Sequence, residues 1–335
     1  MLSKTTLGTW CAALLICACA WSCRGGRSGR SAEPRVTDTL ALNFLNAEQA
    51  AAFLGSADHH TQSLDRFALE ALTGREGATA EDFRQFAAAQ ARDWDPAVMQ
   101  MVREKTDSLN GVIRQKGLKL NFPAQIDIMV TTLREEGEAA GYTRGASIVC
   151  SKDMLTWAPP HLVTELIAHE AFHVLTRNDP ELRRELYALI GFTVLPRSVE
   201  LPDGLAEYVI DNPDVNAHDS YATFQIDGQP RNCLMLLYSK RDYEGGAFWD
   251  YFSTGLLEID PETCQPVLDE EGNYHIYEVE EASDFFDKVG RNTTYVIDPE
   301  EVLADNFSFL LTRDIDTMPS PDLLRRIEAV CRGER

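Results

Sequence analysis

The strongest pattern of hydrophobic and polar positions lies between residues 160 and 177. Its apolar positions recur at helical spacing, at Leu162, Leu166, Ile167, Phe172 and Val174. One face, at positions i, i+3, i+4 and i+7, consists of Leu166, His169, Glu170 and His173. A proline is favourable in the first turn of a helix. The pattern predicts one helix from about Pro160 to Arg177, with both histidines on a face that the fold buries.

Upstream of this helix, residues 39–117 carry apolar groups at helical spacing, the first of them at residues 42–45. The breaks between the groups coincide with residues that interrupt helices, at Gly55, Gly74, Gly77 and Pro96. The pattern predicts a helical region over residues 38–120.

Strand patterns lie on both sides of the predicted helix. Residues 125–131 alternate between apolar and polar positions, and residues 146–150 form a second short apolar run. Strand-like runs at 221–226 and 233–238 flank Asp227-Gly228, a dipeptide typical of tight hairpins. Two further helices and a strand are expected at residues 179–191, 321–331 and 274–279. The fold class that we predict is α+β, with a β-rich insertion after the helix at 160–177.

The first 22 residues contain one lysine and an apolar run from Leu14 to Ala20, which is too short for a membrane span and predicts a signal peptide. Ser22-Cys23 resembles the cleavage junction of bacterial lipoproteins, which implies a lipid anchor on Cys23, with Cys19 as a second candidate. Gly- and Arg-rich residues 23–37 are then a flexible tether. We expect an exported cell-envelope lipoprotein that meets the membrane only through its anchor. A secreted or periplasmic protein is the alternative.

Four cysteines remain beyond the predicted signal and anchor: Cys150, Cys233, Cys264 and Cys331. In an exported protein they permit two disulfides, with three possible pairings, or they are buried thiols.

The formal net charge of −22 argues against nucleic acid and anionic membrane surfaces as partners, because binding of phosphates needs clustered Lys and Arg. Oxygen ligands for calcium are densest at residues 211–219. That stretch lacks the spacing of an EF-hand loop, so we interpret it as a solvated turn.

The helix at 160–177 carries the clearest chemical motif, His169-Glu170-Ala171-Phe172-His173. Histidines four apart on a helix can bind one zinc ion, while the glutamate beside the first can act as general base toward a polarised water. Two buried histidines satisfied by ordinary hydrogen bonds are the alternative interpretation. The motif predicts one Zn²⁺ per chain, held by His169 and His173, with Glu170 as the catalytic base.

A catalytic zinc needs a third protein ligand. Asp298 can cap a helix whose first turn contains Pro299, and Glu301 and Asp305 share one face of that helix. Glu301 is therefore the favoured ligand, and Asp305 can accept the free N–H of a ligating histidine. Other candidates for the third ligand remain open, namely Asp203, Glu207, His161 and His218.

These two helices resemble the motif helices of the gluzincins, the thermolysin-like zinc peptidases. The resemblance covers those helices alone. It implies a zincin-like catalytic region over residues 121–335, with His169, His173 and Glu301 as ligands, Glu170 as base and Asp305 in the second shell. It also implies an edge strand for the substrate, for which residues 147–151 are the candidate. The segment from Leu201 resembles the ligand segment of aminopeptidase-like gluzincins, with Asp203 in place of its glutamate.

The function expected is that of a zinc metallopeptidase acting on peptide or protein substrates. The donor that stabilises the oxyanion stays open among Tyr187, Tyr208, Tyr221, Tyr243, His218 and His275. A zinc-binding, non-proteolytic envelope protein and a zinc-dependent hydrolase of a non-peptide amide are the alternative functions. A purely structural site closes its fourth position with protein and needs no base, whereas either hydrolase requires Glu170.

Overall fold

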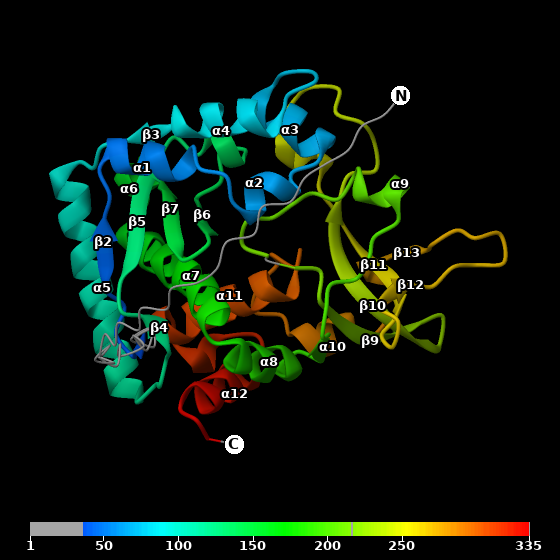
Figure 1. The fold of residues 1–335 in the computed structure, drawn as a ribbon. Coiled ribbons are helices and arrows are strands. Elements are labelled where there is room, and N and C mark those ends of the chain that lie inside the picture. The colour runs from blue at the N-terminus through cyan, green and yellow to red at the C-terminus, as the bar shows by residue number, and fades with distance from the viewer. Residues whose placement is uncertain (1–35, 216, 335) are drawn as a thin grey trace, which may run out of the picture. The chain divides into compact units, whose positions relative to one another are not determined.

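The computed structural model describes residues 36–215 and 217–334, without the side chain of Asp203. Within them the fold is mixed α+β, which confirms the predicted class. One sheet has the order β2-β5-β7-β6, and β3 also pairs with β5. Its strands are β2 (Leu42–Phe44), β3 (Ala91–Arg92), β5 (Ile126–Thr131), β6 (Gly141–Arg144) and β7 (Ser147–Ser151). β6 runs antiparallel to β7 at the sheet edge (Figure 1).

Both faces of this sheet are buried. Alternate residues of β5 point to opposite sides, so that Ile128 belongs to one hydrophobic cluster and Met129 to another. The first cluster includes α5 (Pro96–Lys116) and α7 (Pro160–Asn178). The second consists largely of the N-terminal helices α1 (Ala47–Leu54), α3 (Arg66–Thr73) and α4 (Ala80–Ala88). Short elements complete this half, namely α2 (His59–Ser63), α6 (Lys152–Trp157), η1 (Arg134–Glu136), and β1 (Val36–Thr37) paired with β4 (Phe122–Pro123).

A second, curved sheet lies in sequence between α7 and α11 (Pro299–Thr312), with the order β12-β11-β10-β9-β8 and with β13 also on β11 (Figure 1). Its strands are β8 (Phe192–Val194), β9 (Ser220–Ile226), β10 (Gln229–Tyr238), β11 (Ser253–Asp260), β12 (Gln265–Pro266) and β13 (Ile276–Glu278). Asp227 and Gly228 both have positive φ, 51° and 71°, as the tight turn between β9 and β10 requires. The predicted hairpin is therefore confirmed.

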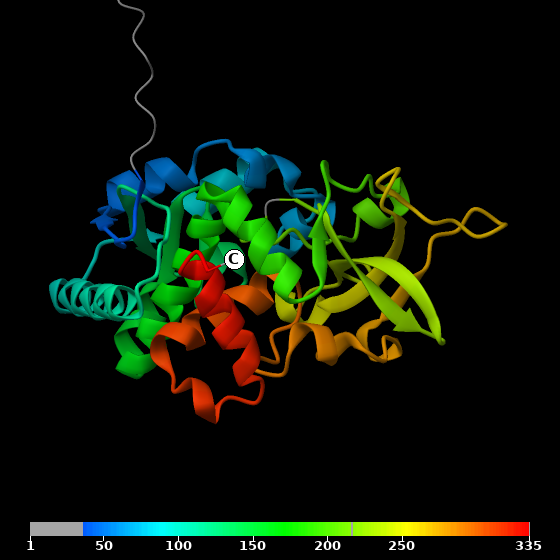
Figure 2. The same cartoon turned by 90° about the horizontal axis from the view of Figure 1, so that it is seen from below.

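The remaining helices follow α7 in the sequence. They are α8 (Pro180–Leu189), α9 (Asp203–Ala206), α10 (Phe285–Val289) and α12 (Pro321–Cys331), with short 3₁₀ turns η2 (Phe248–Tyr251), η3 (Val279–Glu281) and η4 (Ile315–Thr317). Helix α12 packs on α8 and α11 (Figure 2). Phe172 of α7 and Phe307 of α11 have ring centroids 5.4 Å apart, within the shared core. This packing holds the two helices that carry the predicted site against each other.

Two expectations about strands are wrong. Residues 42–44, expected within the helical region, form β2, because pairing with β5 satisfies their backbone and buries Leu42 and Phe44 against the core. Residues 147–151 were the candidate edge strand, but β7 lies between β5 and β6. The free edge belongs to β6.

The four cysteines are buried and free, so the possibility of two disulfides is excluded and that of buried thiols holds. They belong to separate parts of the interior, on β7, on β10, before β12 and at the end of α12.

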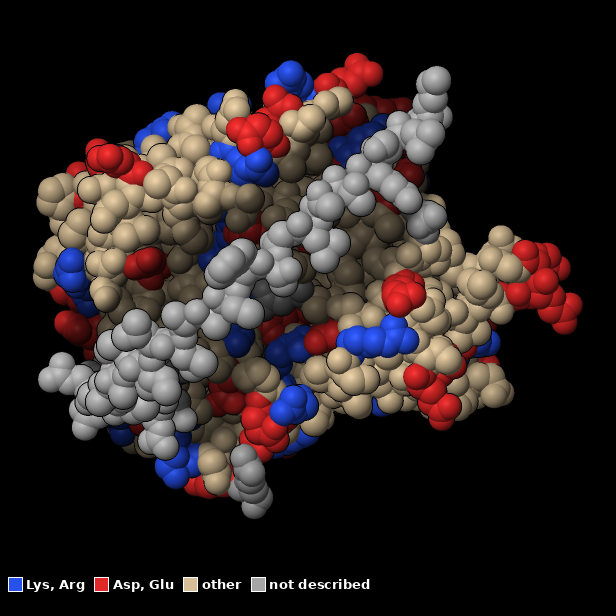
Figure 3. All heavy atoms as spheres, viewed as in Figure 1, with Lys and Arg blue, Asp and Glu red and all other residues tan. Residues whose placement is uncertain are grey.

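One loop that projects from the surface has an acidic tip. The loop between β12 and β13 carries Asp269, Glu270 and Glu271, all exposed, at its tip (Figure 3). Among the described residues no helix is both long and apolar enough to cross a membrane. The predicted signal peptide, the anchor at Cys23 and nearly all of the tether lie outside the described residues.

Candidate functional site

Helix α7 presents the His-Glu-His motif to helix α11. His169 is partly buried, whereas Glu170 and His173 are 2% and 0% exposed. On α11, the Asp298 side chain accepts the backbone N–H of Glu300 at 2.8 Å, and Pro299 follows in the first turn. The cap and the proline therefore start the helix where the sequence predicts, and they place Glu301, which is 1% exposed, opposite α7.

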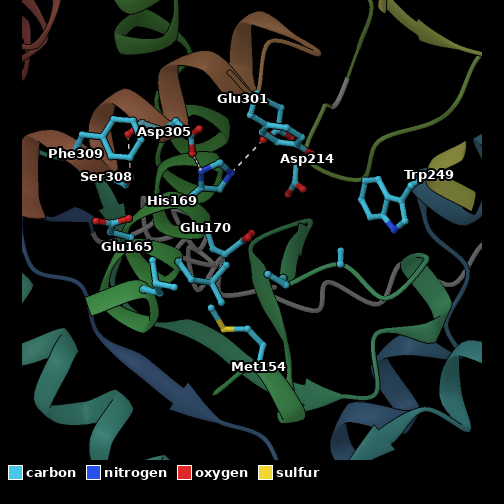
Figure 4. Close-up of a pocket in the computed structure, with 16 residues that line it drawn as sticks. Met154, Glu165, His169, Glu170, Asp214, Trp249, Glu301, Asp305, Ser308 and Phe309 are labelled. Carbon is cyan, nitrogen blue, oxygen red and sulfur yellow. Dashed lines mark hydrogen bonds and ion pairs between the residues drawn. The ribbon is translucent and has the colours of Figure 1, made fainter. Parts of the chain in front are cut away.

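The structure brings His169 together with both carboxylates predicted for it. Its Nδ1 lies 2.9 Å from Asp305 Oδ1, and its Nε2 lies 3.1 Å from Glu301 Oε2 (Figure 4). Burial opposes protonation of His169, but the hydrogen bonds to Asp305 and Glu301 raise its pKa well above the usual value. Asp305 orients the ring so that Nε2 faces Glu301.

His173 is oriented by a residue that the sequence analysis missed. Its Nδ1 lies 3.3 Å from Glu300 Oε1, and the other Glu300 oxygen accepts the Tyr187 hydroxyl at 2.7 Å. This leaves Nε2 of His173 facing Glu301 Oε2 at 3.7 Å. Although buried, this nitrogen has no hydrogen-bond partner among the described residues. A buried polar atom without a partner is costly, so its environment calls for an additional group.

A metal ion fits this place. Donor atoms of His169, His173 and Glu301 lie within 4.8 Å of one another, and so do those of Glu170, His173 and Asp214. Nitrogen and carboxylate donors in this combination match what zinc accepts. Burial alone would raise the pKa of Glu301, but His173 and the hydrogen bond from His169 lower it to about 2. Glu301 is therefore ionised, as a ligand must be.

Glu170 projects into the cleft from the other side of the motif. One of its oxygens accepts the Thr143 hydroxyl at 2.9 Å. A Cβ at Gly141 would approach the other oxygen to 3.0 Å, so the strand passes this close only because residue 141 is glycine. Burial raises the pKa of Glu170, with opposing contributions from His169 and His173. The position and the hydrogen bond equip Glu170 to exchange a proton with a group in the cleft.

Asp214 joins the site from the loop before β9. It is 8% exposed, and the backbone N–H of Thr143 donates to its Oδ1 at 2.6 Å. The interpretation of 211–219 as a solvated turn is therefore wrong for this residue. The loop is fastened to the site because Asn212 Nδ2 donates to Glu301 Oε1 at 2.6 Å and Asn212 Oδ1 accepts the Asp214 N–H at 2.9 Å. The only sign of Asp214 in the sequence is the dense run of acidic and amide side chains at residues 211–219.

The same loop is anchored to the N-terminal helices by His60. Its Nδ1 lies 2.8 Å from Asp211 Oδ2 and its Nε2 lies 2.9 Å from Glu136 Oε1, in a buried network. Burial disfavours the charged imidazole, but attraction to Glu136 and the bond to Asp211 outweigh it and raise the pKa of His60 to about 10. The network stabilises the loop that supplies Asn212 and Asp214.

This network makes stability depend on pH in a defined direction. The folded pKa of about 10 lies above the unfolded value of 6.5, so the contribution of His60 is complete below pH 6.5 and is lost as pH rises toward 10. We expect the unfolding free energy contributed by this residue to fall by up to about 1.4 kcal/mol per pH unit in that window. Urea unfolding across the window, compared between the wild type and His60→Gln, measures it. The exposed neighbour serves as control, because His59→Gln should keep the wild-type slope.

The cleft at this site has a volume of about 430 Å³. Its walls contain Met154, Leu162, Trp249 and Phe309, and Trp249 lies on the opposite side of the cleft from Phe309 (Figure 4). The hydroxyl-bearing ring in the lining is Tyr295, which the sequence analysis did not consider. None of the six donors proposed from sequence lines this cleft within the described part of the chain. Tyr187, for example, is buried and donates to Glu300.

The rival third ligands whose side chains the structure describes do not join the two donor groups. Glu207 and His161 are exposed, and His218 lies before β9 without contributing to either group. The backbone of Asp203 begins α9, but its side chain lies outside the described part of the structure. Among the carboxylates considered from sequence as third ligand, Glu301 is the one that the structure brings to the two histidines.

We compared the chain with models of protein families, with curated proteins and with solved structures, and none of them matches it.

Proposed function

We propose that this protein is a zinc-dependent peptidase with a gluzincin-like, zincin-type catalytic region. The observation that carries the proposal is the convergence of His169 Nε2, His173 Nε2 and Glu301 Oε2, with the buried His173 nitrogen lacking any hydrogen-bond partner among the described residues. A carboxylate outside this donor group, that of Glu170, lies beside it in an open cleft. Three protein donors, a base and access for a substrate are the parts that hydrolysis requires.

In this mechanism each side chain has a distinct task. His169, His173 and Glu301 would hold the zinc, which would supply polarisation of the attacking water and of the substrate carbonyl. Glu170 accepts the proton of that water and returns it to the leaving amine. The Thr143 hydroxyl holds one oxygen of Glu170, so the other oxygen can face the substrate. Asp305 and Glu300 keep the two imidazole rings oriented through their Nδ1 atoms.

The edge strand β6 supports an extended peptide as the substrate. Ser151 N–H donates to Ala140 O across the sheet, so by alternation the backbone groups of Gly141 point away from β7. Gly141 also lines the cleft, next to Glu170. A substrate strand can add to this edge and bring its peptide bond to Glu170.

Tyr295 is the candidate donor to the oxyanion. Burial, followed by the negative charges of Glu301 and Asp214, raises its pKa, so its hydroxyl keeps the proton that it must donate. We expect Tyr295→Phe to lower kcat by about 10²- to 10³-fold, with unchanged zinc content. Steady-state kinetics on a cleaved peptide measures the loss. Tyr243→Phe is the matched control, because Tyr243 does not line the cleft; an equal loss in both variants would contradict the role of Tyr295.

The proposal as a whole is tested by elemental analysis of the purified protein together with digestion of a peptide library, read by mass spectrometry. We expect one zinc per chain and cleavage that a chelator abolishes and added zinc restores. Absence of zinc after reconstitution would refute the site. Zinc without cleavage of any peptide would refute the peptidase. The library also contains non-peptide amides, and cleavage of these alone would identify a zinc-dependent hydrolase of a non-peptide amide.

A non-catalytic zinc protein is the second candidate, and one observation favours it. Asp214 gives the site a fourth carboxylate or imidazole donor close to His173, as a closed structural site would have. Such a site leaves Glu170 without a task. The two candidates are therefore separated by whether the zinc-loaded protein can take up an added ligand.

A further inference from the structure

Two possible donor groups in the site share one residue, His173, and its Nε2 atom faces a carboxylate of each group. We propose that Asp214 is a fourth protein ligand that closes the metal site at rest and that leaves it when a substrate strand binds to β6. The inference rests on the proposed zinc site and adds to it a built-in closure. Glu301 and Asp214 then have different tasks, since Glu301 stays on the ion and Asp214 is exchangeable.

The distances place Asp214 almost as close to the shared atom as Glu301. His173 Nε2 lies 3.9 Å from Asp214 Oδ1 and 3.7 Å from Glu301 Oε2. Two ligand atoms that are each about 2 Å from one zinc ion lie at most about 4 Å apart. Each carboxylate satisfies this limit toward His173 Nε2, and both carboxylates are buried. Asp214 and Glu301 belong to separate donor groups, so binding of one ion by both requires the Asp214 side chain to move toward Glu301. The unpartnered nitrogen of His173 faces the two of them.

Asp214 is held there by a built arrangement. Arg177 donates to the carbonyl oxygens of Pro213 at 2.6 Å and of Thr143 at 3.1 Å, which ties the loop to β6. Asn212 connects the same loop to Glu301 through its side-chain amide. With the hydrogen bond from Thr143 N–H to Asp214, the loop is fixed at three points, and the carboxylate of Asp214 is directed at the histidine rather than at solvent.

The attachment to β6 explains how a substrate can release Asp214. Thr143 N–H points away from β7, in the same direction as the backbone groups of Gly141, and donates to Asp214 Oδ1. A substrate strand that pairs with β6 as far as Thr143 competes for this N–H. It therefore removes the hydrogen bond that holds Asp214 next to His173. Binding along the edge and opening of the fourth position are coupled through one backbone group.

The test compares the full-length wild type with Asp214→Asn, using zinc affinity by chelator competition, the visible spectrum of the Co²⁺-substituted protein, and binding of acetohydroxamate as a metal-seeking probe. We expect Asp214→Asn to weaken zinc binding by about 10-fold or more, to change the Co²⁺ spectrum and to tighten acetohydroxamate binding to the metal-loaded protein by about 10-fold. The tighter probe binding is decisive, because a merely structural Asp214 would not produce it.

Glu165→Gln is the matched control, since Glu165 lines the same cleft and belongs to neither donor group. Equal changes in both variants, or no change in Asp214→Asn, would overturn the proposal while leaving the zinc site intact. A wild type that binds no zinc would overturn both. Crystal structures of the zinc-loaded wild type decide the question even where Asp214→Asn fails to fold. Asp214 must ligate the ion in the structure without acetohydroxamate and must not ligate it in the structure with acetohydroxamate.

Discussion

Replacing Glu170 with glutamine is expected to lower peptide hydrolysis by about 10²- to 10⁴-fold while leaving one zinc per chain in place. An amide cannot accept the proton of the attacking water, but it keeps the shape of the side chain and can still accept the Thr143 hydroxyl. Zinc should remain because His169, His173 and Glu301 form a donor group without Glu170. Kinetics and elemental analysis of the same preparation measure both quantities.

The matched control for this variant is Glu181→Gln, on the exposed first turn of the neighbouring helix α8. It removes the same charge from the surface and should retain wild-type activity, since exposed ion pairs contribute little to stability. Full activity in Glu170→Gln would refute the general base. Loss of zinc together with activity would instead identify Glu170 as a ligand.

Replacing Glu301 with glutamine is expected to weaken zinc binding by more than about 100-fold, because even an outer-shell partner is worth about 10- to 100-fold. At a fixed zinc concentration well above the Kd of both proteins, a 100-fold weaker site gives about 2.7 kcal/mol less stabilisation of the fold by the metal. Chelator competition measures the affinity, and thermal unfolding with and without zinc measures the stabilisation. Both the zinc affinity and the stabilisation by zinc should fall in Glu301→Gln.

Two further variants serve as comparisons for the loss of zinc affinity in Glu301→Gln. Glu300→Gln loses the charged partner of His173 Nδ1, so we expect a smaller loss of zinc affinity, about 10- to 100-fold. Glu207→Gln, at an exposed position after α9, should bind zinc as the wild type does. If Glu207→Gln lost zinc and Glu301→Gln kept it, the third ligand would be Glu207, from the segment that begins at Leu201.

The parts of the site that the sequence predicts are those encoded by local signals. Helix α7 follows from apolar spacing, and helix α11 follows from a capping aspartate and a proline, so the placement of Glu301 and Asp305 on one face could be predicted. Their approach to α7 was an inference from chemistry, since the two helices are far apart in the chain. In the structure, the packing of Phe172 on Phe307 holds α11 against α7.

The parts that could not be predicted depend on contacts between distant segments. Asp214 meets Thr143 across 71 positions, and Asn43 of β2 meets Asp127 of β5 across 84. Neither contact leaves a periodic pattern in the sequence. Glu300 was overlooked for a different reason: it lies beside Glu301 but points to the second histidine, which only the relative rotation of the two helices determines.

Because both faces of the sheet that contains β5 and β7 are buried, only some fragments of this protein can be expected to fold. The N-terminal helices supply most of one hydrophobic face, and β2 supplies a flanking strand. A fragment beginning at residue 121 would therefore expose Met129 and Val149 and leave β5 without its neighbour β2. Exposed apolar faces and open strand edges are the surfaces through which chains aggregate. The segment before α7 is thus an integral part of one folding unit, and a fragment trimmed to the candidate site is not expected to fold on its own.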